Sequence, residues 1–237
     1  MAHRFFSDER ISGDRITLRD TEARHLTQVM RKRVGEQVDL FDGSGYEFRA
    51  TVTEMDRRHV ELSIDERIDV NRELFYELTL AVALPKGDRQ MWMVQKLVEL
   101  GVTRLIPIKT TRGVAQPTGK ALDRLHRQVI EASKQCGRNV LMSIHSPTNV
   151  EDLSAELSAD CLRFIAHVTP TPNGAWTPTA TDVCFAVGPE GGFTDDEVSR
   201  LVEAGWNSLQ LGERILRIET AAVAVASWWG ISNWLSQ

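Results

Sequence analysis

Two stretches decide the fold of this chain: Val183-Cys-Phe-Ala-Val-Gly-Pro-Glu-Gly-Gly-Phe193 and Ser208-Leu-Gln-Leu-Gly-Glu-Arg-Ile-Leu-Arg-Ile-Glu-Thr-Ala221. Each opens with a short run typical of a strand and continues into a glycine-bearing turn. Ligands of α/β sheets bind at the carboxyl ends of strands, where such turns lie. Three glycines within five residues, at 188, 191 and 192, leave backbone amides open to a planar or extended ligand. The same glycines also suit a plain tight turn, so both interpretations stay open.

The sequence around these stretches alternates between apolar strands and amphipathic helices from residue 78 onward. This alternation predicts an α/β domain with a mainly parallel sheet covered on both faces. We predict strands at 78–84, 104–108, 161–167, 183–187 and 208–211, and helices at 88–101, 120–136, 194–205 and 219–235. The third helix opens with a capping box, Thr194-Asp-Asp-Glu197, and the Pro-, Thr- and Gly-rich stretch 169–181 predicts a loop.

The first 70 residues follow a different pattern, with short runs of β-formers between turn signals. We predict strands at 37–41, 48–52 and 60–64, a hairpin turn at 42–45 and one helix at 21–30. A short-stranded, mostly antiparallel barrel follows from this pattern. With the boundary near 72–77, the predicted domains are 1–73 and 74–237.

Composition is that of an ordinary globular protein, with 42% hydrophobic and 26% charged residues among 237. No apolar run reaches the roughly 20 residues of a membrane span, so we expect a cytoplasmic protein that does not insert into membranes. The three cysteines, Cys136, Cys161 and Cys184, are widely spaced and lack CxxC partners. They predict neither a disulfide framework nor a metal site, and small core side chains are the expected role.

The glycine spacing excludes two common nucleotide sites. The stretch 188–193 does not match GxGxxG, and Gly119-Lys120 is followed by Ala121 rather than by Ser or Thr. A P-loop for nucleotide hydrolysis is therefore absent, and a Rossmann dinucleotide site is unsupported.

Charge argues against a broad nucleic-acid surface, since the formal net charge is −5. Residues 1–73 hold 13 Lys and Arg against 16 Asp and Glu. Any basic contact must therefore be local, and Arg31-Lys32-Arg33 is the densest cluster. A solvated turn explains that cluster equally well.

Short motifs along nearly the whole chain resemble the ribosomal RNA small subunit methyltransferase E family of the SPOUT superfamily. The two most specific are GPEGGF at 188–193 and LGERILRIETA at 211–221. The others are Arg4-Phe5-Phe6, His25-Leu-Thr-Gln-Val-Met-Arg31, Phe41-Asp42-Gly43, Lys86-Gly-Asp-Arg89, Gln95-Lys96, Glu99-Leu-Gly101, Glu131-Ala132, Gln135 and Arg138.

The resemblance implies an S-adenosyl-L-methionine-dependent enzyme that methylates N3 of one uridine in the 16S rRNA of the small ribosomal subunit. It also implies a PUA-like N-terminal β-barrel for RNA, a C-terminal trefoil knot that holds the cofactor, and a homodimer with the active site at the subunit boundary. The knot rests on the resemblance alone, because true knots are rare. Part of the final helix, with its alanines and with Trp228, Trp229 and Trp234, is expected at the interface as well as in the core.

The resemblance also assigns the cofactor site to the two turns. The implied cofactor-binding residues are Val187, Gly188, Glu190, Gly191, Gly192, Leu211, Gly212, Ile215, Leu216, Arg217 and Thr220. The chain departs from the family pattern at Ile218, Gly113 and Met142, where threonine, serine and proline are usual. A side-chain hydroxyl contact at position 218 is therefore in question.

A uridine imide nitrogen carries a proton at neutral pH and must lose it before it can accept a methyl group. An arginine about 4 Å from the developing charge, at an effective dielectric of about 20, contributes about 4 kcal/mol, or roughly three pKa units. Arg217, or Arg138 on the face shared with Glu131 and Gln135, is the candidate. Glu190 or Glu219 is the candidate proton acceptor, although Glu219 suits an N-terminal helix-dipole partner better.

RNA contacts are expected from Arg4, His25, Arg31, Lys32 and Arg33, with the target base unstacked. Two alternatives remain. One is a SPOUT methyltransferase with another RNA target, such as a ribose 2′-hydroxyl or a guanine nitrogen. The other is a non-catalytic RNA-binding ribosome-assembly factor that retains the fold.

Overall fold

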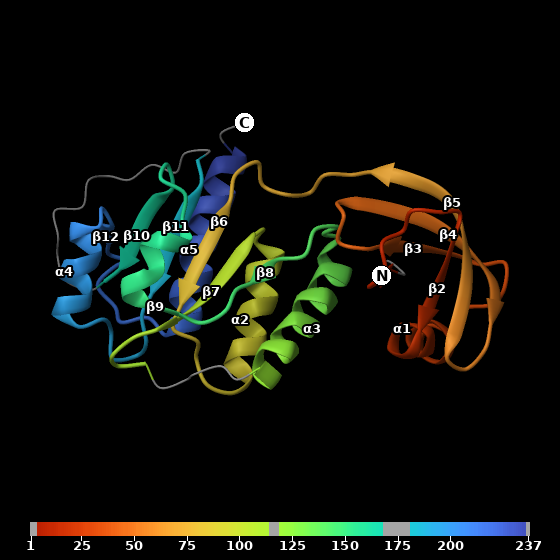
Figure 1. Cartoon of the computed structure of the whole chain (residues 1–237), viewed down its shortest axis with the longest axis horizontal. Coiled ribbons are helices and arrows are strands. Elements are labelled where there is room, and N and C mark those ends of the chain that lie inside the picture. The colour runs from red at the N-terminus through yellow and green to blue at the C-terminus, as the bar shows by residue number, and fades with distance from the viewer. Residues whose placement is uncertain (1–3, 114–118, 168–180, 236–237) are drawn as a thin grey trace. The chain divides into compact units, whose positions relative to one another are not determined.

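The computed structural model describes residues 4–113, 119–167 and 181–235, which form two compact units (Figure 1). The first unit runs to Glu73 and also contains Ile130–Leu141, and the second holds Leu74–Val129 and the chain from Met142 onward. The sequence placed 130–141 in the C-terminal domain. Polar contacts explain the difference: Arg4 donates to the Ser133 carbonyl, and the Asn139 amide donates to the Val70 carbonyl.

The first unit is built on a five-stranded sheet in the order β1-β3-β4-β5-β2. Its strands are β1 (Arg4–Phe6), β2 (Arg15–Arg19), β3 (Gln37–Phe41), β4 (Tyr46–Met55) and β5 (His59–Asp69). β1 pairs with β3 in parallel, and the remaining pairs are antiparallel. The predicted strands correspond to β3 and to segments of β4 and β5. Sequence analysis did not predict β1 and β2, which span three and five residues.

The predicted N-terminal helix is present as α1 (Asp20–Arg24) followed by one turn of π-helix, η1 (His25–Val29). Ala23 and Leu26 point into the core of the first unit, where they join Phe5, Leu40 and Leu62. Apolar residues alternate with polar ones along β4 and β5, so one face of the sheet is buried.

The second unit contains a seven-stranded sheet in which every described pairing is parallel, which confirms the predicted sheet type. The strand order is β12-β10-β11-β6-β7-β8, with β9 also paired to β7. The strands are β6 (Leu78–Val82), β7 (Arg104–Lys109), β8 (Ser143–Ile144), β9 (Thr148–Asn149), β10 (Leu162–Ala166), β11 (Val183–Val187) and β12 (Asn207–Leu209).

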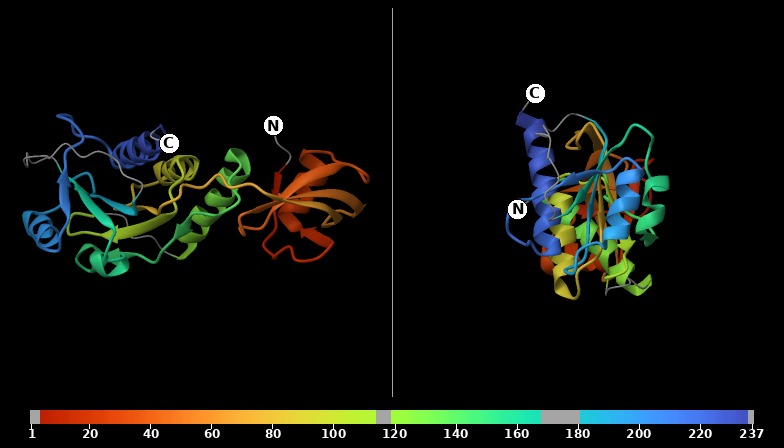
Figure 2. Two further views of the ribbon diagram at one scale, coloured as in Figure 1. Left: turned by 90° about the horizontal axis from the view of Figure 1, so that it is seen from above. Right: turned by 90° about the vertical axis from the view of Figure 1, so that its left-hand side faces the viewer.

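Helices cover both faces of this sheet, as the right-hand view of Figure 2 shows. They are α2 (Asp88–Glu99), the 3-10 helix η2 (Val150–Glu156), α4 (Asp195–Glu203) and α5 (Ile218–Leu235). A further helix, α3 (Gly119–Cys136), begins in the second unit, and its residues from Ile130 onward belong to the first. α2 and α5 pack together on one side, and η2 and α4 pack together on the other. The predicted helices are therefore present, whereas η2, β8 and β9 were not anticipated. Most of the predicted loop 169–181 lies outside the described residues.

The two layers of core differ in their side chains. Under α5, Phe164 and Phe185 stack with their ring centroids 5.3 Å apart, and Trp229 packs against both rings. The opposite face is lined by smaller side chains from the strands, which meet Phe193, Leu201 and Trp206. Because β11 is buried along its whole length, its residues read as a continuous apolar run.

Two of the three cysteines are core residues, as predicted. Cys161 and Cys184 are buried and free, and Cys136 is partly exposed. Burial raises the pKa of Cys161 to about 11 and that of Cys184 well above its ordinary value, so both stay thiols at neutral pH. Among the described residues, no cluster of three or more His, Cys, Asp or Glu side chains could hold a metal ion. None of the helices in the described ranges is long and apolar enough to span a bilayer.

We predict that Trp229→Ala lowers the free energy of unfolding by about 3–5 kcal/mol, because it leaves a cavity beside Phe164 and Phe185. Val202→Ala on α4 is the control, since Val202 is 47% exposed and its loss is expected to cost no more than about 0.5 kcal/mol. Urea unfolding of both variants tests this. Equal losses of stability would contradict the assigned core.

Candidate functional site

A cavity of about 300 Å³ lies in the second unit where β10, β11 and β12 end. β10 is placed between β11 and β12, so the turn after β11 and the turn after β12 flank the end of β10. Ala166 and His167 lie at that end and line the cavity with both turns. The parallel strand order thus brings together two segments that the sequence separates.

Most of the predicted cofactor-binding residues line this cavity, namely Val187, Gly188, Glu190, Gly191, Gly192, Leu211, Gly212, Ile215 and Leu216. The other lining residues were not among the predicted cofactor-binding residues, although position 218 had been noted as a departure inside the expected cofactor loop. They are Arg112, Ala166, His167, Pro189, Phe193, Asp195, Arg214, Ile218 and Ala221. Several of these are neighbours of predicted residues, but Arg112, Ala166 and His167 come from other segments of the chain. No local motif marks those three.

Glycine is required by geometry in the first turn. A Cβ atom on Gly188 would lie 2.9 Å from Cε2 of Phe193, a buried side chain that lines the cavity. Gly192 has a φ of +69°, in the left-handed region that other residues rarely adopt, and its N–H donates to the Pro189 carbonyl at 2.8 Å. The turn is therefore tight, and its three glycines present backbone rather than side chains to the cavity.

Arg112, which follows β7, binds the backbone of this turn through two hydrogen bonds. Its guanidinium donates to the carbonyl oxygens of Gly191 at 2.8 Å and Phe193 at 3.3 Å. Its aliphatic part lies against Gly191, where an added Cβ would come within 3.3 Å of Arg112 Cδ. A side chain from a distant loop therefore fixes the backbone of the glycine turn.

Glu197 connects the same loop to α4. The capping box is present: Thr194 Oγ1 accepts from the Glu197 N–H, and a Glu197 carboxylate oxygen accepts from the Thr194 N–H at 2.8 Å. The other carboxylate oxygen accepts from the Thr111 N–H at 2.7 Å. Burial raises the pKa of Glu197, but these backbone donors outweigh it, so the net pKa lies below the ordinary value.

The predicted acidic residue Glu190 is exposed over 53% of its side chain and pairs with Arg89 of α2, with an N···O distance of 3.3 Å. Arg217 and Thr220 are exposed and do not line the cavity. The Arg217 carbonyl accepts from the Ala221 N–H at 2.9 Å, which starts α5. Glu219 is buried in the first turn of α5, and its role as a helix-dipole partner stays a prediction.

Comparison with known proteins identifies the family. A family model described as "RNA methyltransferase domain" matches residues 72–230, and one described as "RNA methyltransferase PUA domain" matches residues 18–65. The ribosomal RNA small subunit methyltransferase E of Aquifex aeolicus is 30% identical over 232 residues, covering 95% of this chain and 97% of the relative. The chain belongs to the ribosomal RNA small subunit methyltransferase E family.

Solved structures agree. A ribosomal RNA small subunit methyltransferase E from Neisseria gonorrhoeae, crystallised with S-adenosyl methionine, superposes with a TM-score of 0.87 at 31% identity over 96% of each chain. A putative methyltransferase from Legionella pneumophila, solved with bound SAM, gives a TM-score of 0.89 at 30% identity over 98% of each chain.

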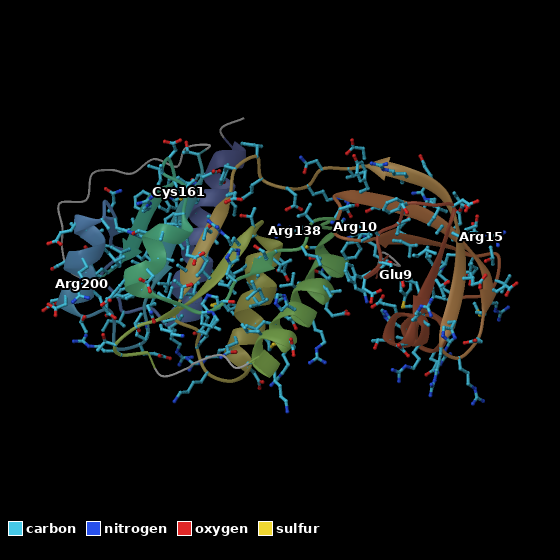
Figure 3. The ribbon with its side chains drawn as sticks, in the orientation of Figure 1. Glu9, Arg10, Arg15, Arg138, Cys161 and Arg200 are labelled. Atoms are coloured by element: carbon cyan, nitrogen blue, oxygen red, sulfur yellow. The ribbon has the colours of Figure 1, made fainter. Side chains whose placement is uncertain are left out.

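The second predicted arginine, Arg138, belongs to the first unit and follows α3 (labelled in Figure 3). It is 4% exposed, and its guanidinium makes a bidentate pair with the Glu73 carboxylate. It does not line the cavity. This geometry gives Arg138 a structural task, and its catalytic role stays a prediction.

The predicted RNA contacts differ in exposure. Arg4 is 6% exposed, donates to the Ser133 carbonyl at 3.0 Å and lies over the Phe41 ring, so it holds the first unit together. Arg31 and Arg33 are exposed, and His25 is partly exposed. Lys32 donates to the Gln37 carbonyl at 3.1 Å. A direct RNA contact by each of the five residues remains a prediction.

The three departures from the family pattern all fall on residues that the structure describes. Ile218 is buried and lines the cavity, so an apolar side chain replaces the usual hydroxyl there. Met142 is 1% exposed and fills the core. For Gly113, an added Cβ would lie 2.9 Å from Thr110 Oγ1, so the usual serine would require a local shift.

Glu197 generates a pH prediction. A carboxyl whose pKa is lowered by folding stabilises the protein above its ordinary value of 4.5, and that stability is lost as the pH falls through the lower folded value. We expect the difference in unfolding free energy between wild type and Glu197→Gln to be largest near neutral pH. It should shrink as the pH is lowered from 5 toward 3. Urea unfolding across this range measures it, and a difference independent of pH would contradict the hydrogen-bonded carboxylate.

Proposed function

We propose that this protein is an S-adenosyl-L-methionine-dependent methyltransferase that methylates N3 of a specific uridine in the 16S rRNA of the small ribosomal subunit. The observation that carries the proposal is the cavity formed jointly by the two glycine-bearing turns. Two relatives with the same fold were solved with this cofactor bound. We place the enzyme in the cytoplasm with its substrate.

The lining of the cavity fits the cofactor. Val187, Leu211, Leu216 and Ile218 offer apolar walls for a flat heterocycle, and the glycine turn offers backbone polar groups to an extended chain. A volume of about 300 Å³ is within the range of small-molecule sites. When bound, the cofactor supplies an electrophilic methyl group on a sulfonium. The protein's own residues must position the acceptor and remove its proton.

We assign the stabilisation of the uridine anion to Arg217 and the proton acceptor to Glu190. Glu190 lines the cavity, and Arg217 lies between Leu216 and Ile218, which both line it. Arg217 is solvent-exposed, so its full effect requires that bound RNA excludes water. Arg138 is the second candidate for stabilising the uridine anion. It ranks below Arg217 because its guanidinium must first leave the Glu73 carboxylate.

RNA binding is assigned to the first unit, which we propose is a PUA-like barrel. The exposed basic side chains of Arg31 and Arg33 are available for phosphates. Lys32 lies between them in sequence, and His25 precedes Arg31 by six residues. Arg4 donates a hydrogen bond to the Ser133 carbonyl, so it supports RNA binding through the packing of the first unit. A direct contact between Arg4 and RNA requires that RNA binding breaks that hydrogen bond. The target base must leave its stack before N3 is accessible.

We propose further that the cofactor turns form part of a trefoil knot and that two copies form a homodimer. Ile215 lines the cavity, yet it is 84% exposed to water. An exposed apolar side chain beside a binding site is typical of a surface that another protein covers. Trp92 of α2 and Ile231 of α5 are also about half exposed. A second subunit that covers such side chains would close the site.

The proposal is tested by incubating the purified protein and labelled cofactor with small subunits from a strain that lacks the enzyme, followed by mass spectrometry of the nucleosides. We expect N3-methyluridine at one position. A methylated ribose or guanosine would indicate another RNA target for the same fold. No methylated nucleoside, together with no cofactor binding by calorimetry, would favour a non-catalytic assembly factor.

Arg217→Ala should lower kcat by one to three orders of magnitude while cofactor affinity stays within about threefold, because the side chain acts on the anion of the acceptor. Arg200→Ala, on the exposed face of α4 (Figure 3), is the control and should leave kcat unchanged. Steady-state methylation of small subunits measures kcat for the two variants, and calorimetry measures their affinity for the cofactor. A wild-type rate in Arg217→Ala and in Arg138→Ala would contradict the electrostatic role.

A further inference from the structure

We infer that Arg89 is a positioning residue that ties the glycine turn at 188–193 to the first turn of α5. Arg89 is the second residue of α2, outside both turns. One of its guanidinium nitrogens lies 3.3 Å from Glu190 Oε1, and another lies 3.6 Å from Glu219 Oε1. One cation thus links the two segments that form the cavity. The inference rests on the proposed function in one respect, because cofactor affinity is one of its two readouts.

The Glu219 end of this bridge is buried. Glu219 is 7% exposed, and its Oε2 has no hydrogen-bond partner among the residues that the structure describes. A buried carboxylate is unfavourable unless opposite charge compensates it, and Arg89 and the N-terminus of α5 supply that charge. Ile218 and Ala221, which are neighbours of Glu219 in the sequence, line the cavity. Displacement of Glu219 would therefore move one wall of the site.

The Glu190 end is exposed and belongs to a turn that has few side chains of its own. The three glycines contribute no side-chain contacts of their own to this turn, so side chains from outside it help to limit its motion. Arg112 fastens the carbonyl oxygens of Gly191 and Phe193, and Arg89 fastens the side chain of Glu190. An exposed ion pair adds little to global stability, so its effect should appear in the order of the turn and in ligand affinity.

The bridge is tested with Arg89→Ala, Arg89→Lys and the double variant Arg89→Ala/Glu219→Gln. Arg200→Ala is the matched control, because Arg200 pairs with Glu151 in the same unit at similar or greater exposure and away from the cavity. Thermal unfolding establishes that each variant is folded. If Arg89→Ala does not fold, the double variant replaces it, since it no longer carries an uncompensated buried charge.

The first readout is amide hydrogen exchange of the ligand-free protein over 188–193, where the Gly192 N–H is bonded to the Pro189 carbonyl. We expect exchange to be at least fivefold faster in Arg89→Ala and unchanged in Arg200→Ala. The second readout is calorimetry with S-adenosyl-L-methionine, in which Arg89→Ala should bind about 10- to 100-fold more weakly. Arg89→Lys should restore part of that affinity. The double variant should also recover part of it, because the Glu219→Gln substitution leaves a neutral amide at the buried end.

Wild-type exchange and wild-type affinity in a folded Arg89→Ala protein would overturn the inference. Failure of the wild-type protein to bind the cofactor would overturn the proposed function instead. In that case the exchange experiment still decides whether Arg89 orders the turn. An equal loss of order in Arg200→Ala would also count against the bridge, because it would indicate a general effect of removing surface charge.

Discussion

The placement of β10 between β11 and β12 is the constraint on which the site depends. All three strands run parallel, so their carboxyl ends reach the same edge of the sheet. The turns that follow β11 and β12 are therefore brought to either side of β10, although about 20 residues separate them in the chain. Burial of aromatic side chains beneath α5 holds this arrangement in register.

Side chains from outside the turns give the site its definite shape. Arg112 holds backbone carbonyls of the glycine turn, Glu197 joins the loop after β7 to the start of α4, and Arg89 bridges Glu190 and Glu219. Glycines leave the backbone of a turn accessible to a ligand, but they also allow that backbone more conformations. The polar contacts around the turn restrict those conformations without filling the space that a ligand needs. The glycines and the arginines therefore act together to shape the cavity.

Much of this could be predicted from local patterns, and the remainder depended on contacts across the chain. The apolar run at 183–187, the capping box at Thr194 and the two glycine turns are local signals, and each corresponds to an element or a lining segment. Arg112, Ala166 and His167 carry no such signal, because only the strand order brings them to the cavity. Residues 130–141 were predicted to belong to the domain 74–237, because the helix at 120–136 follows its strands in the sequence. That order cannot reveal that Arg4 and Val70 bond to residues 133 and 139. Strand β1 is only three residues long, too short for periodicity to detect.

If the cavity between the two turns holds the methyl donor, a crystal structure of this protein with S-adenosyl-L-methionine must show the donor there. We expect electron density for the cofactor in contact with Gly188, Gly191, Leu211 and Leu216, which line the cavity. Density for the cofactor at another place on a folded protein, with both turns free of ligand, would contradict this assignment.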